Sequence, residues 1–338
     1  MRRLVALFLT ALVLATLAPQ AEAQTSEPDS RVRAQKPDSR LRGVGKRVVF
    51  STGAGDARPS RFVIVRNQGG GTMNVGPVTI TGTNASSFSL EDPAQDTTFS
   101  LGPDEVQNVE VLFDPSGAAG RYDAVLNLPT NEAPAGTVVQ VRLKGLNADG
   151  YEMELEPTLY KILTTLGYEP GVGDPNRFPD GNLLPGLTYA DEVNAPFWRK
   201  RKAENKVSMT PLGRYSTVTP NSCCIAGWFE QGTGTRHELQ RFPGGPPPDG
   251  GENQKIFPEA TGRIEFSPPG NFGVYANNEF SDQGGRPFRF FRARAINGSF
   301  RPGLWIVVQD QSGGDAPGMV KNNDYNDFVW LLRNARPA

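Results

Sequence analysis

The fold class of this chain is decided by the stretch RFVIVRNQG, residues 61–69. Branched and aromatic apolar residues fill the stretch, and Asn, Gln and Gly close it, which is typical of a short β-strand followed by a turn. Similar patches follow one another through the first half of the chain: RVVFST, MNVGPVTITG, SSFSLE, TTFSLG, QNVEVLFDP, YDAVLNLPT and VVQVRLKGL. Turn residues bound each patch, so the spacing predicts a sandwich of antiparallel strands over residues 46–147.

An ordered series of short motifs runs through this region: Phe62 to Asn67, Ile80-Thr81-Gly82, Phe88-Ser89-Leu90, Leu101-Gly102-Pro103, Val109 to Phe113 with Asp114-Pro115, Gly120-Arg121-Tyr122 and Val141 to Gly145. This series resembles the Hydin-like (abnormal-spindle-type) immunoglobulin-like domain family. The resemblance implies a seven-stranded sandwich that serves as a spacer or docking module and has no catalytic residues of its own. The motifs are marks of a fold, because Asp114-Pro115, for example, ends a strand through the fixed φ and missing N–H of proline.

The N-terminus predicts export. Arg2 and Arg3 precede an apolar run from Leu4 to Ala18, and the small-x-small triplet at 21–23 supplies a cleavage pattern, so residues 1–23 are predicted to be a Sec-type signal peptide. The run is shorter than the roughly 20 residues of a membrane span, and we expect no transmembrane segment after cleavage. Without a lipobox cysteine or a sorting motif, the sequence favours a secreted or extracytoplasmic protein.

Residues 24–45 are polar and carry the tetrapeptide PDSR twice, which predicts a disordered linker. Removal of residues 1–23 takes away two arginines and one glutamate, so 33 basic and 35 acidic side chains remain, a net charge of −2. This balance argues against a nucleic-acid partner.

The second half of the chain opens with a different pattern. In LEPTLYKILTTLG, residues 155–167, leucine and isoleucine recur three and four positions apart, so we expect one short helix over residues 157–166. β patches separated by polar loops follow: GRYSTVTP, CCIAGWFEQ, GRIEFSP, NFGVYANN, FRFFRARAI, LWIVVQD and DFVWLLRN. The sequence thus predicts a mainly β protein, in which an immunoglobulin-like sandwich is followed by a second, larger, jelly-roll-like β-sandwich domain over residues 151–335.

Several motifs occur together in this second half: Glu-Pro-x-Leu leading to Leu-Gly-Tyr (156–168), FGVY (272–275), an aromatic-basic strand (288–294), WIVVQD (305–310) and Asp-Tyr-Asn-Asp before FVWLLRN. Together they resemble the DYND-motif C-terminal β domain of secreted bacterial surface proteins. That family has no settled activity and is found beside sugar-binding modules on exported proteins. The resemblance therefore implies an exported β domain without assigning it a reaction.

The motif NNDYND, residues 322–327, is dense in oxygen ligands. In one extended strand Asp324 and Asp327 would point to opposite faces, but a turn would let them converge. Asp310 and Asp315 precede the motif and could add carboxylates. Calcium takes about six to eight oxygen ligands, so the sequence predicts a two-segment calcium site. The alternative is that these side chains cap a turn through Asx-type hydrogen bonds.

Other chemistry-bearing residues are few. Cys223 and Cys224 are the only cysteines, and being adjacent they would form either a strained vicinal disulfide or two thiols on opposite strand faces. His237 is the only histidine, which excludes a multi-histidine zinc site and the usual base for a Ser or Cys nucleophile. The basic run at 198–202 predicts a solvated loop, with contact to acidic polysaccharide or lipid headgroups as the alternative.

We therefore expect a secreted or cell-surface, non-catalytic binding or structural protein, whose second domain binds a surface glycan or a protein partner. A secreted carbohydrate-active hydrolase is one alternative, because glycosidases need only a carboxylate pair, which would be drawn from Glu265, Glu279, Asp282, Asp310 or Asp327. A pure structural spacer is another. Exposed aromatic side chains could stack on sugars, although core positions are the alternative for each candidate, namely Trp198, Trp228, Tyr275, Trp305 and Tyr325.

Overall fold

The computed structural model describes residues 31–34, 46–53, 56–131, 137–150, 155–169, 179–216, 225–242, 254–257, 262–295, 297–311 and 322–338. The predicted signal peptide, Asp315, Cys223 and Cys224 lie outside these ranges. Of the predicted linker at 24–45, the structure describes only β1 (Arg31–Ala34), which pairs in parallel with the strand at 60–67.

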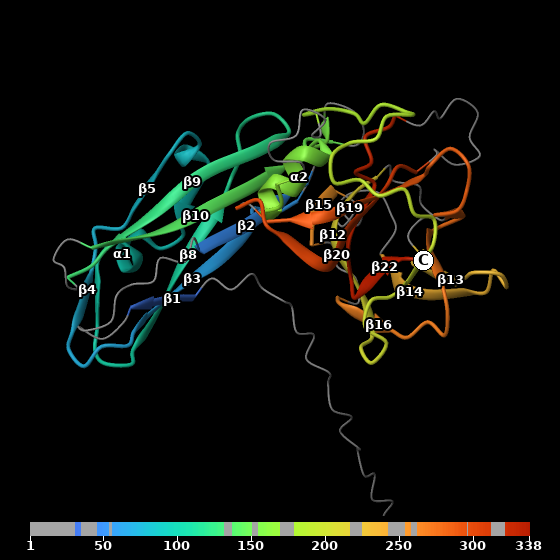
Figure 1. Cartoon of the computed structure of the whole chain (residues 1–338). Coiled ribbons are helices and arrows are strands. Elements are labelled where there is room, and N and C mark those ends of the chain that lie inside the picture. Colours follow the sequence, from blue (N-terminus) through green and yellow to red (C-terminus); the bar gives the residue numbers. More distant parts are fainter. Residues whose placement is uncertain are drawn as a thin grey trace, which may run out of the picture.

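The first domain is an immunoglobulin-like sandwich of two facing sheets (Figure 1). Its further strands are β2 (Lys46–Thr52), β3 (Ser60–Asn67), β4 (Met73–Val75), β5 (Thr79–Thr81), β6 (Phe88–Leu90), β7 (Phe99–Leu101), β8 (Val106–Phe113), β9 (Gly120–Pro129) and β10 (Val138–Asn147). One sheet has the order β1-β3-β8-β6 and the other β2-β10-β9-β5, while β4 pairs with β7. The short helices η1 (Ala85–Ser87) and α1 (Pro93–Asp96) lie in the connections.

Alternating burial explains this sandwich. Along β3, Val63 and Val65 are buried and their neighbours are more exposed, and β8 repeats the pattern at Val109 and Val111. A strand places successive side chains on opposite faces, so each sheet presents one apolar face to the other. Phe113 of β8 joins the aromatic rings of that shared core.

The second domain is a larger sandwich. Its strands are β11 (Trp198–Lys200), β12 (Val207–Tyr215), β13 (Ile225–Glu230), β14 (Arg236–Arg241), β15 (Gln254–Ile256), β16 (Ile264–Phe266), β17 (Phe272–Ala276), β18 (Glu279–Phe280), β19 (Phe288–Arg294), β20 (Phe300–Gln309), β21 (Phe328–Arg333) and β22 (Ala335–Pro337). One sheet has the order β14-β13-β17-β11-β22, with β18 on β17, and the other has the order β15-β12-β21-β20-β19, with β16 on β12. The predicted mainly β fold class is confirmed.

Strand β21 is the centre of the second sheet. It lies between β12 and β20, and its residues Phe328 to Leu332 are buried on both faces. Phe328, Trp330 and Leu332 face the other sheet across the sandwich core, whereas Val329 and Leu331 face a second core on the outside of the sheet. A strand covered on both faces reads as a continuous apolar run, which is the pattern in the sequence.

Helix α2 (Leu159–Leu166) covers that outer core and joins the domains. It begins two residues later than predicted because Thr158 is the N-cap, whose hydroxyl accepts the Lys161 amide at 3.3 Å. Gly167 ends the helix in a left-handed conformation with φ of 85°. Val49 and Leu146 of the first domain are buried in the same core, so the two domains share apolar packing.

Polar contacts also cross this junction. The Ile256 amide donates to the Ser51 hydroxyl at 2.9 Å, and the Arg121 guanidinium donates to the Thr164 hydroxyl at 3.0 Å.

One prediction about the second domain is wrong: residues 198–200 form strand β11 rather than a solvated loop, because the Trp198 side chain is buried in the sandwich core. In the described ranges, no helix is both long and apolar enough to cross a membrane.

Candidate metal centre

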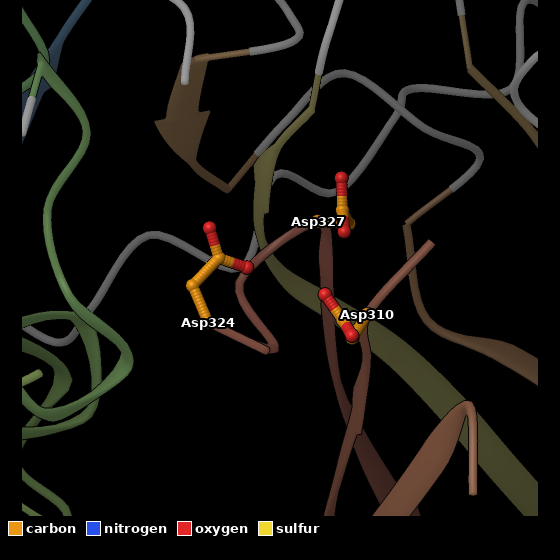
Figure 2. Close-up of side chains that lie close together, drawn as sticks. All are labelled: Asp310, Asp324 and Asp327. Carbon is orange, nitrogen blue, oxygen red and sulfur yellow. The ribbon is translucent and has the colours of Figure 1, made fainter. Parts of the chain in front are cut away.

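Three carboxylates meet where the ladder between β20 and β21 ends. Asp310 directly follows β20, and Asp327 directly precedes β21. Since Gln309 and Phe328 are register partners, the two aspartates lie opposite each other one residue beyond the ladder. Asp324 completes the group, and Figure 2 shows the three side chains close together. One oxygen from each carboxylate lies within 4.8 Å of the others.

The turn before β21 explains why the carboxylates converge. Asn323 and Tyr325 have left-handed backbone conformations, with φ of 63° and 56°, so the alternation of an extended strand does not apply to Asp324 and Asp327. A left-handed conformation costs a residue with a side chain roughly 1–2 kcal/mol, which the surroundings must offset. The Tyr325 hydroxyl donates to the Arg286 carbonyl at 2.9 Å and fixes the turn from outside.

Hydrogen bonds of the turn-capping alternative are present as well. The Asn322 side-chain amide donates to one Asp324 oxygen at 2.5 Å, and the Asn326 backbone amide donates to the other at 3.3 Å. The Gln311 backbone amide donates to Asp327 at 2.7 Å. These donors orient the carboxylates and carry no charge themselves.

Burial makes the ionised form of these three carboxylates less favourable. Asp310, Asp324 and Asp327 are 0%, 8% and 8% exposed. Burial, and next the charge of Asp324, raise the pKa of Asp327 well above its usual 3.8; the Gln311 amide opposes this rise, whereas Glu156 and Asp310 add to it. Bound protons or a cation would offset the repulsion among the three carboxylates.

The donor set fits calcium. Calcium–oxygen contacts are about 2.3–2.6 Å long, so oxygens on opposite sides of one ion are about 5 Å apart, and the 4.8 Å spread of the cluster lies within this limit. Asn326, between the two aspartates of the motif, is 1% exposed, and its side-chain oxygen has no hydrogen-bond partner in the described part of the chain. Carboxylate and amide oxygens are the hard ligands that calcium prefers.

A fourth buried carboxylate connects the cluster to the domain junction. Glu156, which precedes α2, accepts the Gln254 side-chain amide at 2.7 Å and the Asn326 side-chain amide at 3.3 Å. Gln254 belongs to β15, whose Ile256 contacts the first domain. Sequence analysis missed this role, since Glu156 appeared there only as part of a helix motif.

The remaining predicted site residues lie outside the described ranges or elsewhere in the second domain. Asp315, Cys223 and Cys224 lie outside the described residues, so the fourth calcium ligand and the vicinal disulfide stay predictions. His237 lies on β14, where its Nε2 is 3.0 Å from Glu230 Oε1 and its ring stacks on Trp228.

Two carboxylates proposed for a hydrolase are engaged elsewhere: Glu265 accepts from Arg263 at 2.7 Å, and buried Glu279 accepts from Gln309 at 2.6 Å. The predicted candidates for sugar stacking are all buried, as the core alternative requires: Trp198, Trp228, Tyr275, Trp305 and Tyr325.

Fold and site together define a two-domain β protein with a buried acidic cluster. No family model and no curated protein matches the chain. Among solved structures, it is similar to the Escherichia coli chaperone DraB (8% identity, TM-score 0.28, 76% of this chain and 93% of that one). It is also similar to the Pseudomonas aeruginosa CupB2 chaperone (11% identity, TM-score 0.25, 86% of this chain and 98% of that one). A third similar structure is an ASH/PapD-like domain of human CEP192 (16% identity, TM-score 0.23, 31% of this chain and 82% of that one). These TM-scores lie well below 0.5, so the fold assignment rests on the sheets described above.

Proposed function

We propose that this chain is an exported, non-catalytic binding or structural protein whose larger domain is stabilised by a calcium ion at Asp310, Asp324 and Asp327. The observation that carries the proposal is the convergence of three buried carboxylates at the end of β21. Carboxylates buried in this way suit a structural cation, because a substrate cannot reach them. In this proposal the first domain acts as a spacer, and the second binds a surface glycan or a protein partner.

The two sequence resemblances support the same function. The first domain resembles the Hydin-like immunoglobulin-like family, whose members act as spacers or docking modules. The second resembles the DYND-motif domain of secreted bacterial surface proteins, and the aspartates of that motif are Asp324 and Asp327. Export through a signal peptide at 1–23 would bring the chain into compartments where free calcium is abundant.

A hydrolase fits the geometry less well. A glycosidase places two carboxyl groups about 5–10 Å apart on either side of a sugar, with room for the substrate between them. Asp310, Asp324 and Asp327 instead gather their oxygens within 4.8 Å inside the protein. The same carboxylates therefore favour metal binding over acid–base chemistry on a glycan.

The calcium site is tested by thermal unfolding of the mature chain in chelator and in millimolar calcium. Calcium at a hundredfold excess over Kd should stabilise the wild type by about 2.7 kcal/mol. The Asp324→Asn, Asp327→Asn variant should lose that gain, because neutral amides do not replace the carboxylate charge. Asp282→Asn, which changes an exposed carboxylate, is the matched control and should keep the gain.

Direct calcium titration of the wild type by calorimetry keeps the test valid if the double variant does not fold. An unchanged wild-type melting curve together with no heat of binding would mean that NNDYND is a structural turn. The class of function is tested by a glycan array run beside a hydrolysis screen. Product release that Asp310→Asn or Glu279→Gln abolishes would contradict a non-catalytic role, and neither binding nor turnover would favour a pure spacer.

A further inference from the structure

A second group of charges lies at the opposite end of strand β21. Arg333 is the last residue of β21, and its register partners are Leu304 on β20 and Ser208 on β12. Leu304 is buried in the core beneath α2. Residues directly opposite each other in a sheet share a face, so Arg333 lies on the face that packs against α2 and the first domain. Arg301 lies near the start of the neighbouring strand β20.

The first domain contributes an arginine to the same place. Arg47 of β2 alternates with Val49, which is buried in the core shared with α2, so Arg47 also faces the second domain. Its guanidinium lies against Gly167, the left-handed C-cap of α2, and a Cβ atom there would overlap it. The next residue, Tyr168, forms an isolated bridge with Ala295, directly after β19. Arg47 therefore reaches across the domain junction to the residue before Tyr168.

Tyr168 is the common neighbour of the three arginines. Burial raises the pKa of the Tyr168 phenol, and the nearby charges of Arg333, Arg301 and Arg47 act in the opposite direction. The pKa of Arg333 is lowered, first by burial and then through the charges of Arg263 and Arg301, although Tyr168 opposes this. Three guanidinium charges therefore lie near one hydroxyl group, whose raised pKa keeps it protonated at neutral pH.

These arginines lack anionic partners in the structure. Across the described ranges, no ion pair joins Arg47, Arg301 or Arg333 to a carboxylate. Nη1 of Arg47 is buried and has no hydrogen-bond partner there. Glu265, which shares Ser208 as a register partner with Arg333, is already bound by Arg263 at 2.7 Å. Like charges that lie close together repel one another, as the lowered pKa of Arg333 shows, so a bound anion would stabilise the cluster.

We infer that Arg47, Arg301, Arg333 and the Tyr168 hydroxyl form a binding site for one oxyanion: a phosphate, sulfate or carboxylate group. Each guanidinium presents planar donors that match the oxygens of such groups and can bind them in pairs. The hydroxyl adds a neutral donor. Because the arginines come from both domains, the bound anion also bridges the junction. The site is independent of calcium and of the acidic cluster.

The test is calorimetric titration of the mature full chain with sodium sulfate and with inorganic phosphate, at constant ionic strength maintained with chloride. Saturable binding at one site is expected. The Arg301→Gln, Arg333→Gln variant should bind at least tenfold more weakly, and both side chains are exposed, so the variant should fold. The control is Arg199→Gln, Arg336→Gln, which removes the same charge from paired residues on β11 and β22 and should bind like the wild type.

Two results would overturn the inference. The first is a wild-type chain that shows no saturable anion binding above the chloride background. The second is an equal loss of anion affinity in the control variant, which would mean that overall positive charge attracts the anion without a specific site. Competition experiments then identify the source of the anion. Displacement of sulfate by dextran sulfate would indicate a sulfated or otherwise acidic polysaccharide, and displacement by phosphatidylglycerol vesicles would indicate a lipid headgroup. Either displacement must be lost in the Arg301→Gln, Arg333→Gln variant.

Discussion

The two ends of strand β21 carry opposite charges in different environments. Asp327 precedes the strand and Arg333 ends it, roughly 20 Å away at about 3.3 Å per residue. At the acidic end, three buried carboxylates come from two segments close in sequence, and a hydrogen-bonded turn holds them. At the basic end, arginines from both domains lie near Tyr168, and two of the three are exposed.

This difference shows how a fold tolerates charges of one sign. A carboxylate can take up a proton, so the acidic end can reduce its own charge when no cation is bound. Arginine keeps its charge at any ordinary pH, so the basic end depends on water or on an anion. We therefore expect substitutions at the acidic end, which is part of the folded core, to change the free energy of unfolding. Substitutions at the basic end should mainly change the affinity for an anion.

The largest expected effect is at the acidic end. Tyr325→Ala removes a fully buried ring, whose centroid lies 4.6 Å from the Arg289 guanidinium carbon. It also removes the hydroxyl that links the turn to the Arg286 carbonyl. Loss of a buried aromatic side chain costs about 3–5 kcal/mol, which urea unfolding should detect. Phe300→Ala is the comparison at the basic end, where the ring is 42% exposed, and should cost below about 1 kcal/mol. Similar losses for the two variants would contradict the difference between the ends.

A smaller effect is expected at the junction beside the basic end. Gly167→Ala and Gly186→Ala both place a side chain at a left-handed position, with φ of 85° and 79°, and each should cost about 1 kcal/mol for that reason. Only Gly167 faces a neighbour, because its new Cβ would overlap the Arg47 guanidinium, whereas Gly186 has open space. We expect Gly167→Ala to be the more destabilising by at least about 1 kcal/mol and to weaken sulfate binding. Equal stabilities and equal sulfate affinities would show that Arg47 is not held there.

The acidic end was predictable from sequence and the basic end was not. The motif NNDYND is local, and Asp310 is one hairpin away, so the ligand types were visible in one stretch of chain. Their convergence was not, since it depends on the left-handed conformation of Tyr325, which the residue type disfavours. Arg47 and Arg333 are separated by most of the sequence, and they face the same junction only because the domains share the apolar core beneath α2.

Alternation along β3 and the continuous apolar run of β21 were sufficient to predict the β architecture, because the first is typical of a strand with one buried face and the second of a strand covered on both faces. The short run around Trp198 was misassigned as a loop because its charged residues outnumber the one tryptophan. That side chain decides the local structure by entering the sandwich core. The charged composition of this run thus indicated an exposed loop, whereas the burial of Trp198 determines that the segment forms a strand.

The smallest expected effect is a dependence of stability on pH that only the acidic end should produce. The pKa of Asp327 is raised in the folded protein, chiefly by burial and by Asp324, whereas in the unfolded chain it returns to about 3.8. The folded state therefore holds its proton more tightly than the unfolded state does. In chelator, this favourable contribution is complete below about pH 4 and is lost as pH rises through the folded pKa.

Urea unfolding of the wild type and of Asp327→Asn at several pH values from 4 to 8 isolates this contribution, because all other titrating groups are common to the two chains. The unfolding free energy of the wild type should fall relative to that of the variant as pH rises. Saturating calcium should remove this decline, since the ion binds the ionised carboxylates and compensates their repulsion. At the basic end, Arg333→Gln should leave the pH profile unchanged, because arginine keeps its charge throughout this range. Parallel wild-type and Asp327→Asn profiles in chelator would mean that the cluster is already compensated within the fold, and they would remove the physical reason for a cation at NNDYND.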